Sequence, residues 1–179
     1  MAEIKTERLT LRPIVFSDQE DIFEYSKHPL VGPNAGWKPH ESRSETMEIM
    51  KTIFLDQDSV WGIEIKDEKK IIGSIGLIKD TKRENKQAMM LGYAIAYEKW
   101  GKGITTEAAR AVIEYGFEKL GLSLISVWCY AHNNRSRSVI KKCGFKYEGT
   151  MRQAEERYDG KIFDGELYSI TKEEWESGK

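Results

Sequence analysis

The stretch that decides the fold is WGKGITTEAA, residues 100–109. It follows an apolar run, MLGYAIAYE (90–98), that is typical of a strand, and it leads directly into residues that favour a helix. The first turn of a helix carries N–H groups without intrahelical partners, and glycines let an anion approach the backbone closely. The stretch therefore predicts a loop that holds a phosphate group, with a plain strand-to-helix turn as the alternative.

The familiar nucleotide-binding motifs do not fit this loop. No GK[ST] follows a four-residue gap, so the loop is not of the P-loop type. Thr106 occupies the position of the third glycine in G-x-G-x-x-G, which argues against a dinucleotide-binding loop. We expect instead that the loop binds the pyrophosphate of another large cofactor.

The composition excludes several classes of protein. The chain has 179 residues, of which 40% are hydrophobic and 32% charged, as in an ordinary globular domain. Its 28 Lys and Arg against 29 Asp and Glu argue against a direct nucleic-acid partner. No apolar run suits a membrane span or a secretion signal, so we expect a cytoplasmic protein in which Cys129 and Cys143 are reduced. No histidine and cysteine have zinc spacing, and we expect no metal site.

Hydrophobic periodicity and capping residues predict a mixed α/β fold in the order βααβββαβαββ. The predicted strands are Arg8–Pro13, Val60–Lys66, Ile71–Lys79, Ala88–Tyr97, Leu124–Ala131, Phe145–Arg152 and Ile162–Thr171. The predicted helices run from Ser17 through Tyr25, from Ser42 to about Leu55, from Thr105 to Leu120, and from Asn133 or Asn134 to Gly144. The stretch HPLVGPNAGWKPHES, residues 28–42, is expected to be irregular.

A second stretch, NNRSRSVIKKCGF (133–145), changes the interpretation of the first. Together the two resemble the GNAT superfamily of acyl-CoA-dependent N-acyltransferases, whose motifs read Q/R-x-x-G-x-G/A and N-x-x-A/S-x-x-x-Y/L-x-K-x-G-F. Gly103 matches the central glycine of the first motif, whereas Trp100 and Thr105 depart from it. The second motif is matched, apart from Ile140 at the Tyr/Leu position, by Asn133, Ser136, Lys142, Gly144 and Phe145.

Further stretches resemble the branch with the Rim-type (RimJ/RimL-like) N-terminal acetyltransferases of ribosomal proteins. These are TERLTLRP (6–13), GWKPHES (36–42), WGKG followed by TEA, and GFKYEGTMR (144–152). The resemblance extends from residue 6 to about residue 171. It implies one GNAT domain over residues 1–179, with about seven strands splayed at the cofactor site and four main helices on the faces of the sheet.

The resemblance also implies acetyl-CoA as the cofactor and assigns residues to it. The Ala94 and Ile95 backbone would contact the pantetheine arm, with ordinary sheet pairing as the alternative. Asn133 would hold the same arm, or cap the helix, or do both. The family often has proline where this chain has Tyr97. The full set of expected cofactor-binding residues is Ala94, Ile95, Trp100, Gly101, Lys102, Gly103, Ile104, Thr105, Thr106, Asn133, Ser136 and Lys142.

The implied chemistry is direct attack of an amine on the thioester. The Ile95 N–H is the candidate oxyanion stabiliser. Many relatives have a tyrosine acid at the position of Ile140, so Ser136 is the candidate proton donor to the leaving thiolate, or else a residue that only caps or packs. Lys141, Arg135 and Arg137 face the phosphates or are surface charges.

No strong base is visible, and this favours an acceptor with a low pKa. An α-amine has a pKa of about 7.7–8.0, against about 10.4 for lysine. Glu64 and Glu41 are candidate distant bases, or surface residues. The acceptor wall would include Trp37, His40 and Tyr93, with Trp37 as a core anchor in the alternative. We expect acetylation of a protein N-terminus, and the resemblance also implies a homodimer. The alternatives are a small-amine acetyltransferase (polyamine, amino acid or aminoglycoside) and a non-catalytic acyl-CoA-binding module.

Overall fold

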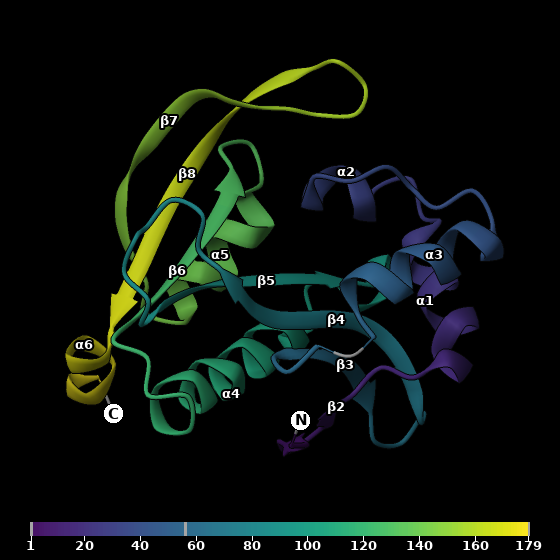
Figure 1. Cartoon of the computed structure of the whole chain (residues 1–179), viewed down its shortest axis with the longest axis horizontal. Coiled ribbons are helices and arrows are strands. Elements are labelled where there is room, and N and C mark those ends of the chain that lie inside the picture. The colour runs from purple at the N-terminus through teal and green to yellow at the C-terminus, as the bar shows by residue number, and fades with distance from the viewer. Residues whose placement is uncertain (1, 56, 179) are drawn as a thin grey trace. The chain divides into compact units, whose positions relative to one another are not determined.

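The computed structural model describes residues 2–55 and 57–178 and contains, within them, a mixed α/β architecture (Figure 1). The strands are β1 (Ile4–Lys5), β2 (Leu9–Arg12), β3 (Val60–Ile65), β4 (Lys70–Lys79), β5 (Ala88–Ile95), β6 (Leu124–Tyr130), β7 (Lys146–Glu156) and β8 (Ile162–Thr171). The helices are α1 (Gln19–Ser26), α2 (Val31–Ala35), α3 (Arg43–Ile53), α4 (Ile104–Glu118), α5 (Asn134–Lys142) and α6 (Lys172–Ser177).

The strands form a mixed sheet in the order β1-β2-β3-β4-β5-β6-β8-β7. Its pairs are antiparallel at β1–β2, β2–β3, β3–β4, β6–β8 and β7–β8, and parallel at β5–β6. The parallel pairing covers Ala88–Leu91, although β5 continues to Ile95. Pairing that stops partway along a strand is the feature expected of a splayed sheet.

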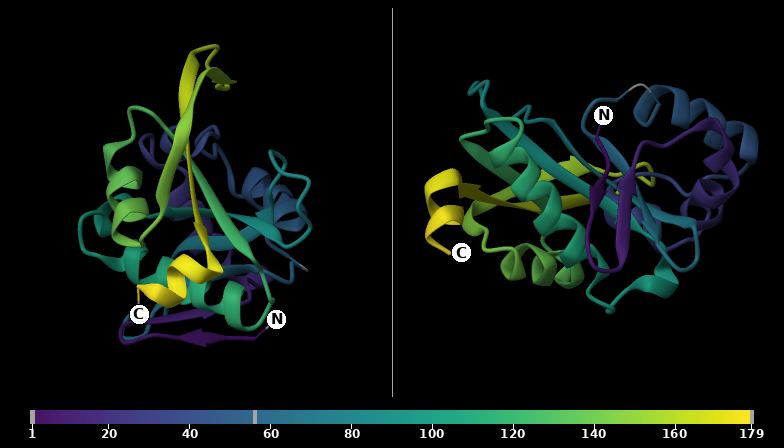
Figure 2. Two further views of the ribbon diagram at one scale, coloured as in Figure 1. Left: turned by 90° about the vertical axis from the view of Figure 1, so that its left-hand side faces the viewer. Right: turned by 90° about the horizontal axis from the view of Figure 1, so that it is seen from below.

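The chain divides into two compact units. The first contains the residues up to Gly76 together with Tyr93–Ala108, and the second contains Leu77–Gly92 together with the chain from Ala109 onward. In the first unit, β2 and β3 supply fully buried side chains to the core, among them Leu9, Leu11, Trp61 and Ile63. The adjacent strands β1 and β2 are the purple pair in Figure 2. This unit holds the glycine loop and the start of α4.

The second unit is built on β6 and the long β7–β8 hairpin. Alternating buried residues of β6 and β8, such as Ile125, Val127 and Ile170, form its core with Phe117 of α4. Figure 1 shows β7 and β8 side by side, with α6 at the end opposite the hairpin turn. Gly160 adopts a φ of 75° in that turn, as the Asp159-Gly160 pair predicted.

Several predicted features of the helices are confirmed. Ser42 caps α3, because its side chain accepts the Glu45 N–H at 3.1 Å. Asn133 caps α5 by accepting the Ser136 N–H at 3.1 Å. Gly121 and Gly144 adopt φ values of 66° and 84° after their helices, in the left-handed region that glycine tolerates.

The capping box predicted at Ser17 is wrong. Phe16–Asp18 form a 3-10 turn, so Ser17 lies inside that turn and α1 begins only at Gln19. The Asp18 carboxylate makes the turn possible, since it accepts the Val15 N–H at 2.9 Å.

The segment 28–42 is not wholly irregular, because it contains α2, which ends at Gly36 with a φ of 92°. The sequence interpretation also missed β1 and α6, and it placed the end of β5 two residues too far, at Tyr97. Tyr97–Lys99 form a 3-10 turn instead. The described helices include none long and apolar enough to span a membrane.

Candidate functional site

The glycine loop has the backbone that its sequence predicted. Gly101 and Gly103 have φ values of 75° and 76°, which only glycine adopts without strain. The first hydrogen bond of α4 runs from the Glu107 N–H to the Gly103 carbonyl at 3.0 Å. The main-chain N–H groups of the first turn, at Ile104 to Thr106, lie at the positive end of the helix.

The loop also has room for an anion. No heavy atom lies within 4 Å of a Cβ placed on Gly101, and the nearest to one on Gly103 is Arg8 Nη2 at 3.6 Å. Gly101, Lys102 and Gly103 are all exposed. An open main-chain cradle at a helix N-terminus fits a diphosphate.

Trp100 fastens this loop to the end of β5. Its indole N–H donates to the Ile95 carbonyl at 2.9 Å. The Trp100 ring lies 5.0 Å from that of Tyr97, which in turn stacks on His28 at 4.5 Å. The tryptophan that departs from the motif thus anchors the loop, and Tyr97 stands in an aromatic group with His28 and Trp100.

The backbone at Ala94 and Ile95 lies close against β4. A Cβ on Gly73 would come within 2.4 Å of the Ala94 carbonyl oxygen. In a planar trans peptide the carbonyl and the following N–H point in opposite directions. The Ala94 carbonyl faces Gly73, so the Ile95 N–H is directed away from Gly73, as an oxyanion donor facing an acyl group would require.

Two of the three predicted acceptor residues, Trp37 and His40, form a small ring cluster in the first unit. Trp37 is half-buried and packs on Gly32, since a Cβ there would lie 2.6 Å from its ring. Its ring centroid is 5.2 Å from that of His40. Trp37 therefore orders the loop, as the alternative interpretation expected, while part of its ring stays accessible. Tyr93, on β5, is also half-buried.

His40 is buried, and burial lowers its pKa. Its Nδ1 lies 3.0 Å from the Thr46 hydroxyl, which itself donates to the Ser42 carbonyl at 3.0 Å. A hydroxyl has one proton to donate, so His40 Nδ1 is the donor in their contact. Nδ1 therefore carries a proton, and the lowered pKa favours the uncharged ring, in which Nε2 holds a lone pair.

Neither carboxylate proposed as a base stands alone. Glu64 accepts from Arg12 Nε at 2.7 Å, and the same guanidinium binds both oxygens of Asp18 at 2.8 Å. The Asp18 hydrogen bond, together with that of Glu64, outweighs burial and raises the pKa of Arg12. Glu41 pairs with Lys38 at 2.7 Å on the surface. Both carboxylates already serve ion pairs.

The second unit carries the remaining predicted site residues. Asn133 caps α5 by accepting the Ser136 N–H, and the Ser136 side chain lies near the buried thiol of Cys129. Burial, with the Glu166 charge adding to it, raises the pKa of Cys129 to about 11. Lys142 is exposed at the last residue of α5, where its carbonyl accepts from Arg110 at 2.8 Å, so it lies at the opposite end of the helix from Asn133.

Arg137 is committed to a structural contact instead of facing solvent. It binds Glu166 through Nε at 2.9 Å and Nη2 at 2.8 Å, and its Nη1 donates to Asn134 at 2.6 Å. The Arg137 hydrogen bond holds the pKa of Glu166 below its ordinary value. The pair fixes the start of α5, with Asn133 and Ser136, to β8.

The sequence interpretation missed the residues that support the glycine loop from behind. Arg8, Thr6 and Glu107 connect β1–β2 to the loop and to α4. Arg8 and Glu107 are 99 positions apart, so no local spacing joins them. Among residues 2–55 and 57–178, no cluster of His, Cys, Asp and Glu could hold a metal ion.

Comparison with known proteins bears on this arrangement. The model of the acetyltransferase (GNAT) domain matches residues 8–146. The chain is 32% identical over 173 residues to the uncharacterized N-acetyltransferase YoaA of Bacillus subtilis, covering 94% of this chain and 96% of that protein. It is 40% identical over 89 residues to the putative ribosomal N-acetyltransferase YdaF of the same organism, covering 50% of this chain and 48% of that one.

A solved structure with a similar fold is spermidine N-acetyltransferase from Vibrio cholerae, in complex with CoA and spermine. Its TM-score is 0.79 at 22% identity, covering 95% of this chain and 99% of that one. At this identity the likeness shows the shared fold.

Proposed function

The chain belongs to the acetyltransferase (GNAT) domain family and is an N-acetyltransferase that uses acetyl-CoA, and on that premise we propose that its acceptor is the α-amine of a protein N-terminus. The observation that carries the proposal is the engagement of both candidate base carboxylates, Glu64 and Glu41, in ion pairs.

The pKa of the acceptor amine decides whether the enzyme must supply a strong base to deprotonate it. Only a neutral amine can attack a thioester. At pH 7.4, deprotonating an α-amine costs less than about 1 kcal/mol, whereas deprotonating a lysine costs about 4 kcal/mol. A site without a dedicated strong base therefore favours an α-amine over lysine by about 200- to 300-fold in the neutral fraction.

The acceptor wall agrees with this reasoning. Burial lowers the pKa of His40, which favours its uncharged form and so limits repulsion of an incoming ammonium group. A base whose pKa lies below 6.5 is poorly matched to lysine but close enough to an α-amine to accept its proton through water. Trp37 beside it offers an apolar surface for the first side chain of a peptide.

We assign the remaining roles within the same proposal. The loop from Trp100 to Thr106 binds the diphosphate, Lys102 and Lys142 add positive charge, and Asn133 holds the pantetheine arm. The acetyl thioester supplies the activated carbonyl carbon. The Ile95 N–H stabilises the oxygen that becomes negative as the amine adds. When the carbon–sulfur bond breaks, the Ser136 hydroxyl donates a hydrogen bond to the sulfur, whose low basicity makes a weak acid sufficient.

The likeness to YdaF supports a protein acceptor, because that protein is described as a putative ribosomal N-acetyltransferase. The spermidine enzyme, at 22% identity, shares the fold and does not decide between this acceptor and a small polyamine. Within the same proposal, the enzyme acts in the cytoplasm and residues 1–179 form one catalytic domain. We also expect the enzyme to form a homodimer.

The test uses three acceptors with acetyl-CoA at pH 7.4: a peptide with a free N-terminus and one internal lysine, the same peptide with its N-terminus blocked, and spermidine. Thiol release gives the rates, and fragment masses locate the acetyl group. We expect acetylation of the first peptide at its α-amine and little turnover of the other two. Acetylation confined to lysine or to spermidine would refute the proposed acceptor.

A further inference from the structure

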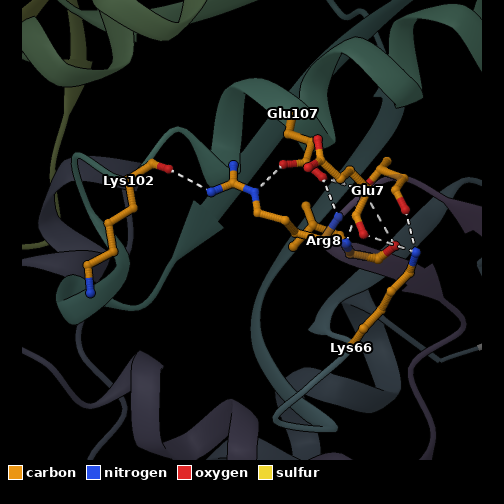
Figure 3. Close-up of polar contacts among 7 residues, drawn as sticks. Glu7, Arg8, Lys66, Lys102 and Glu107 are labelled. Carbon is orange, nitrogen blue, oxygen red and sulfur yellow. Dashed lines mark hydrogen bonds and ion pairs between the residues drawn. The ribbon is translucent and has the colours of Figure 1, made fainter.

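The TERLTLRP motif at residues 6–13 has a role that the proposed chemistry does not use. Figure 3 shows the Arg8 side chain lying between the glycine loop and α4. Its Nη1 donates to the Lys102 carbonyl at 3.1 Å, and its Nε donates to Glu107 Oε2 at 2.6 Å. One guanidinium thus joins the loop to the first turn of the helix that follows it.

The contact with Lys102 orients a loop amide. Lys102 C=O and Gly103 N–H belong to one planar trans peptide, so they point in opposite directions. Because Arg8 holds the carbonyl, the Gly103 N–H is directed to the side away from Arg8. Gly103 has no side chain that could restrain the peptide, and its φ of 76° lies in the left-handed region.

The contact between Arg8 and Glu107 balances a negative charge that would otherwise repel a bound anion. A carboxylate one turn into α4 lies close to the positive end of the helix, where a diphosphate would bind. Here Glu107 Oε1 accepts from the Thr6 hydroxyl at 2.6 Å and from the Arg8 N–H at 2.9 Å. Partial burial raises the pKa of Glu107, but these hydrogen bonds outweigh it and the pKa lies below its ordinary value. The carboxylate is therefore ionised. It points to Thr6 and Arg8, and the Arg8 guanidinium balances its negative charge.

We propose that Arg8 is a positioning residue for the diphosphate of coenzyme A. Arg8 directs the Gly103 N–H outward, and it balances the negative charge of Glu107 behind the loop. The proposal rests on the assignment of the glycine loop as the coenzyme A site. Arg8 itself does not touch the reacting atoms. The competing explanation is a surface ion pair that only ties β2 to α4, and exposed ion pairs contribute little to stability.

The experiment compares two acetyl donors in the full chain. Acetyl-CoA carries the diphosphate, and S-acetyl-pantetheine lacks it. In Arg8→Gln we expect KM for acetyl-CoA to rise about tenfold, the effect of one charge-assisted hydrogen bond. We expect kcat, and KM for S-acetyl-pantetheine, to stay within twofold of wild type, because that donor makes no contact with the loop.

Two further variants serve as a matched control and as a conservative replacement of Arg8. Arg43→Gln removes an exposed arginine that binds Glu20 through two nitrogens at 2.6 and 2.7 Å, far in sequence from the loop, and should leave both donors unaffected. Arg8→Lys keeps the charge but cannot bridge Lys102 and Glu107, so KM for acetyl-CoA should fall between wild type and Arg8→Gln. If Arg8→Gln does not fold, Arg8→Lys carries the same comparison.

The outcomes separate the inference from its premise. If wild type uses S-acetyl-pantetheine as well as acetyl-CoA, the loop does not bind the diphosphate and the premise fails. If wild type prefers acetyl-CoA and the Arg8 variants keep the full preference, the positioning role is wrong while the premise stands. If an Arg8 variant loses the same activity with both donors, the positioning role is also wrong. None of these outcomes depends on which amine serves as the acceptor.

Discussion

Replacing Gly101 with alanine isolates the main-chain contribution of the glycine loop. Gly101 has a φ of 75°, and no heavy atom lies within 4 Å of the added Cβ, so the substitution creates backbone strain without a clash. Left-handed backbone costs an L-residue about 1–2 kcal/mol. The free variant keeps part of this strain, which lowers its stability, and relieves the rest by relaxing the loop; binding must restore the relaxed part. At about 1.4 kcal/mol per factor of ten, affinity for coenzyme A falls about 5- to 30-fold.

The matched control is Gly121→Ala. Gly121 also has a positive φ, 66°, with nothing within 4 Å of the added Cβ, and it follows the far end of α4. Both variants should melt a few degrees below wild type, at about 2–4 °C for each kcal/mol. Calorimetric titration with coenzyme A should show weaker binding for Gly101→Ala alone. If Gly101→Ala binds coenzyme A within twofold of wild type while losing the same stability as Gly121→Ala, the loop backbone does not hold the ligand.

Four further substitutions or treatments test other parts of the account. Asn133→Asp keeps a side chain that caps α5 but loses the amide donor, so stability should hold while coenzyme A binding weakens; unchanged binding would leave Asn133 with the cap alone. Ser136→Ala should lower kcat more than it raises KM, and the reverse pattern in steady-state kinetics would assign the serine to binding. Burial raises the pKa of Cys129 and Cys143 to about 11, so iodoacetamide at pH 7.5 should modify the folded protein slowly and the unfolded protein quickly; equal rates would contradict that burial. His40 has a lowered pKa, so the unfolded chain binds its proton first and stability falls as the pH drops below about 6.5. Urea titrations should show a smaller loss between pH 7.5 and 5 in His40→Asn, and an equal loss would show that His40 does not cause it.

Local signals in the sequence predicted most of the elements correctly. The Ser42 cap and the glycines at 121 and 144 act through neighbours a few residues away, so spacing alone identifies them. The Ser17 signal failed because a more distant partner changed the outcome: Asp18 binds Arg12 and the Val15 N–H, and this favours a 3-10 turn. Helix α6 had a visible signal, since Thr171 and Glu174 form a capping box.

Local sequence signals also predicted part of the candidate site, and the rest depends on contacts between distant residues. The glycine backbone at 101 and 103 and the Asn133 cap followed from residue type and spacing. The contacts that support them did not, because Trp100 Nε1 reaches a strand carbonyl and Arg8 reaches Glu107 across 99 positions. The base candidates Glu64 and Glu41 looked alike in the sequence, and only the folded chain shows that each already has a cation.

The most direct test of the central claim is a crystal structure of the protein grown with coenzyme A. The account predicts diphosphate oxygens within about 3 Å of main-chain nitrogens between residues 101 and 106. A diphosphate bound elsewhere, or held by side chains alone with these nitrogens facing solvent, would contradict it.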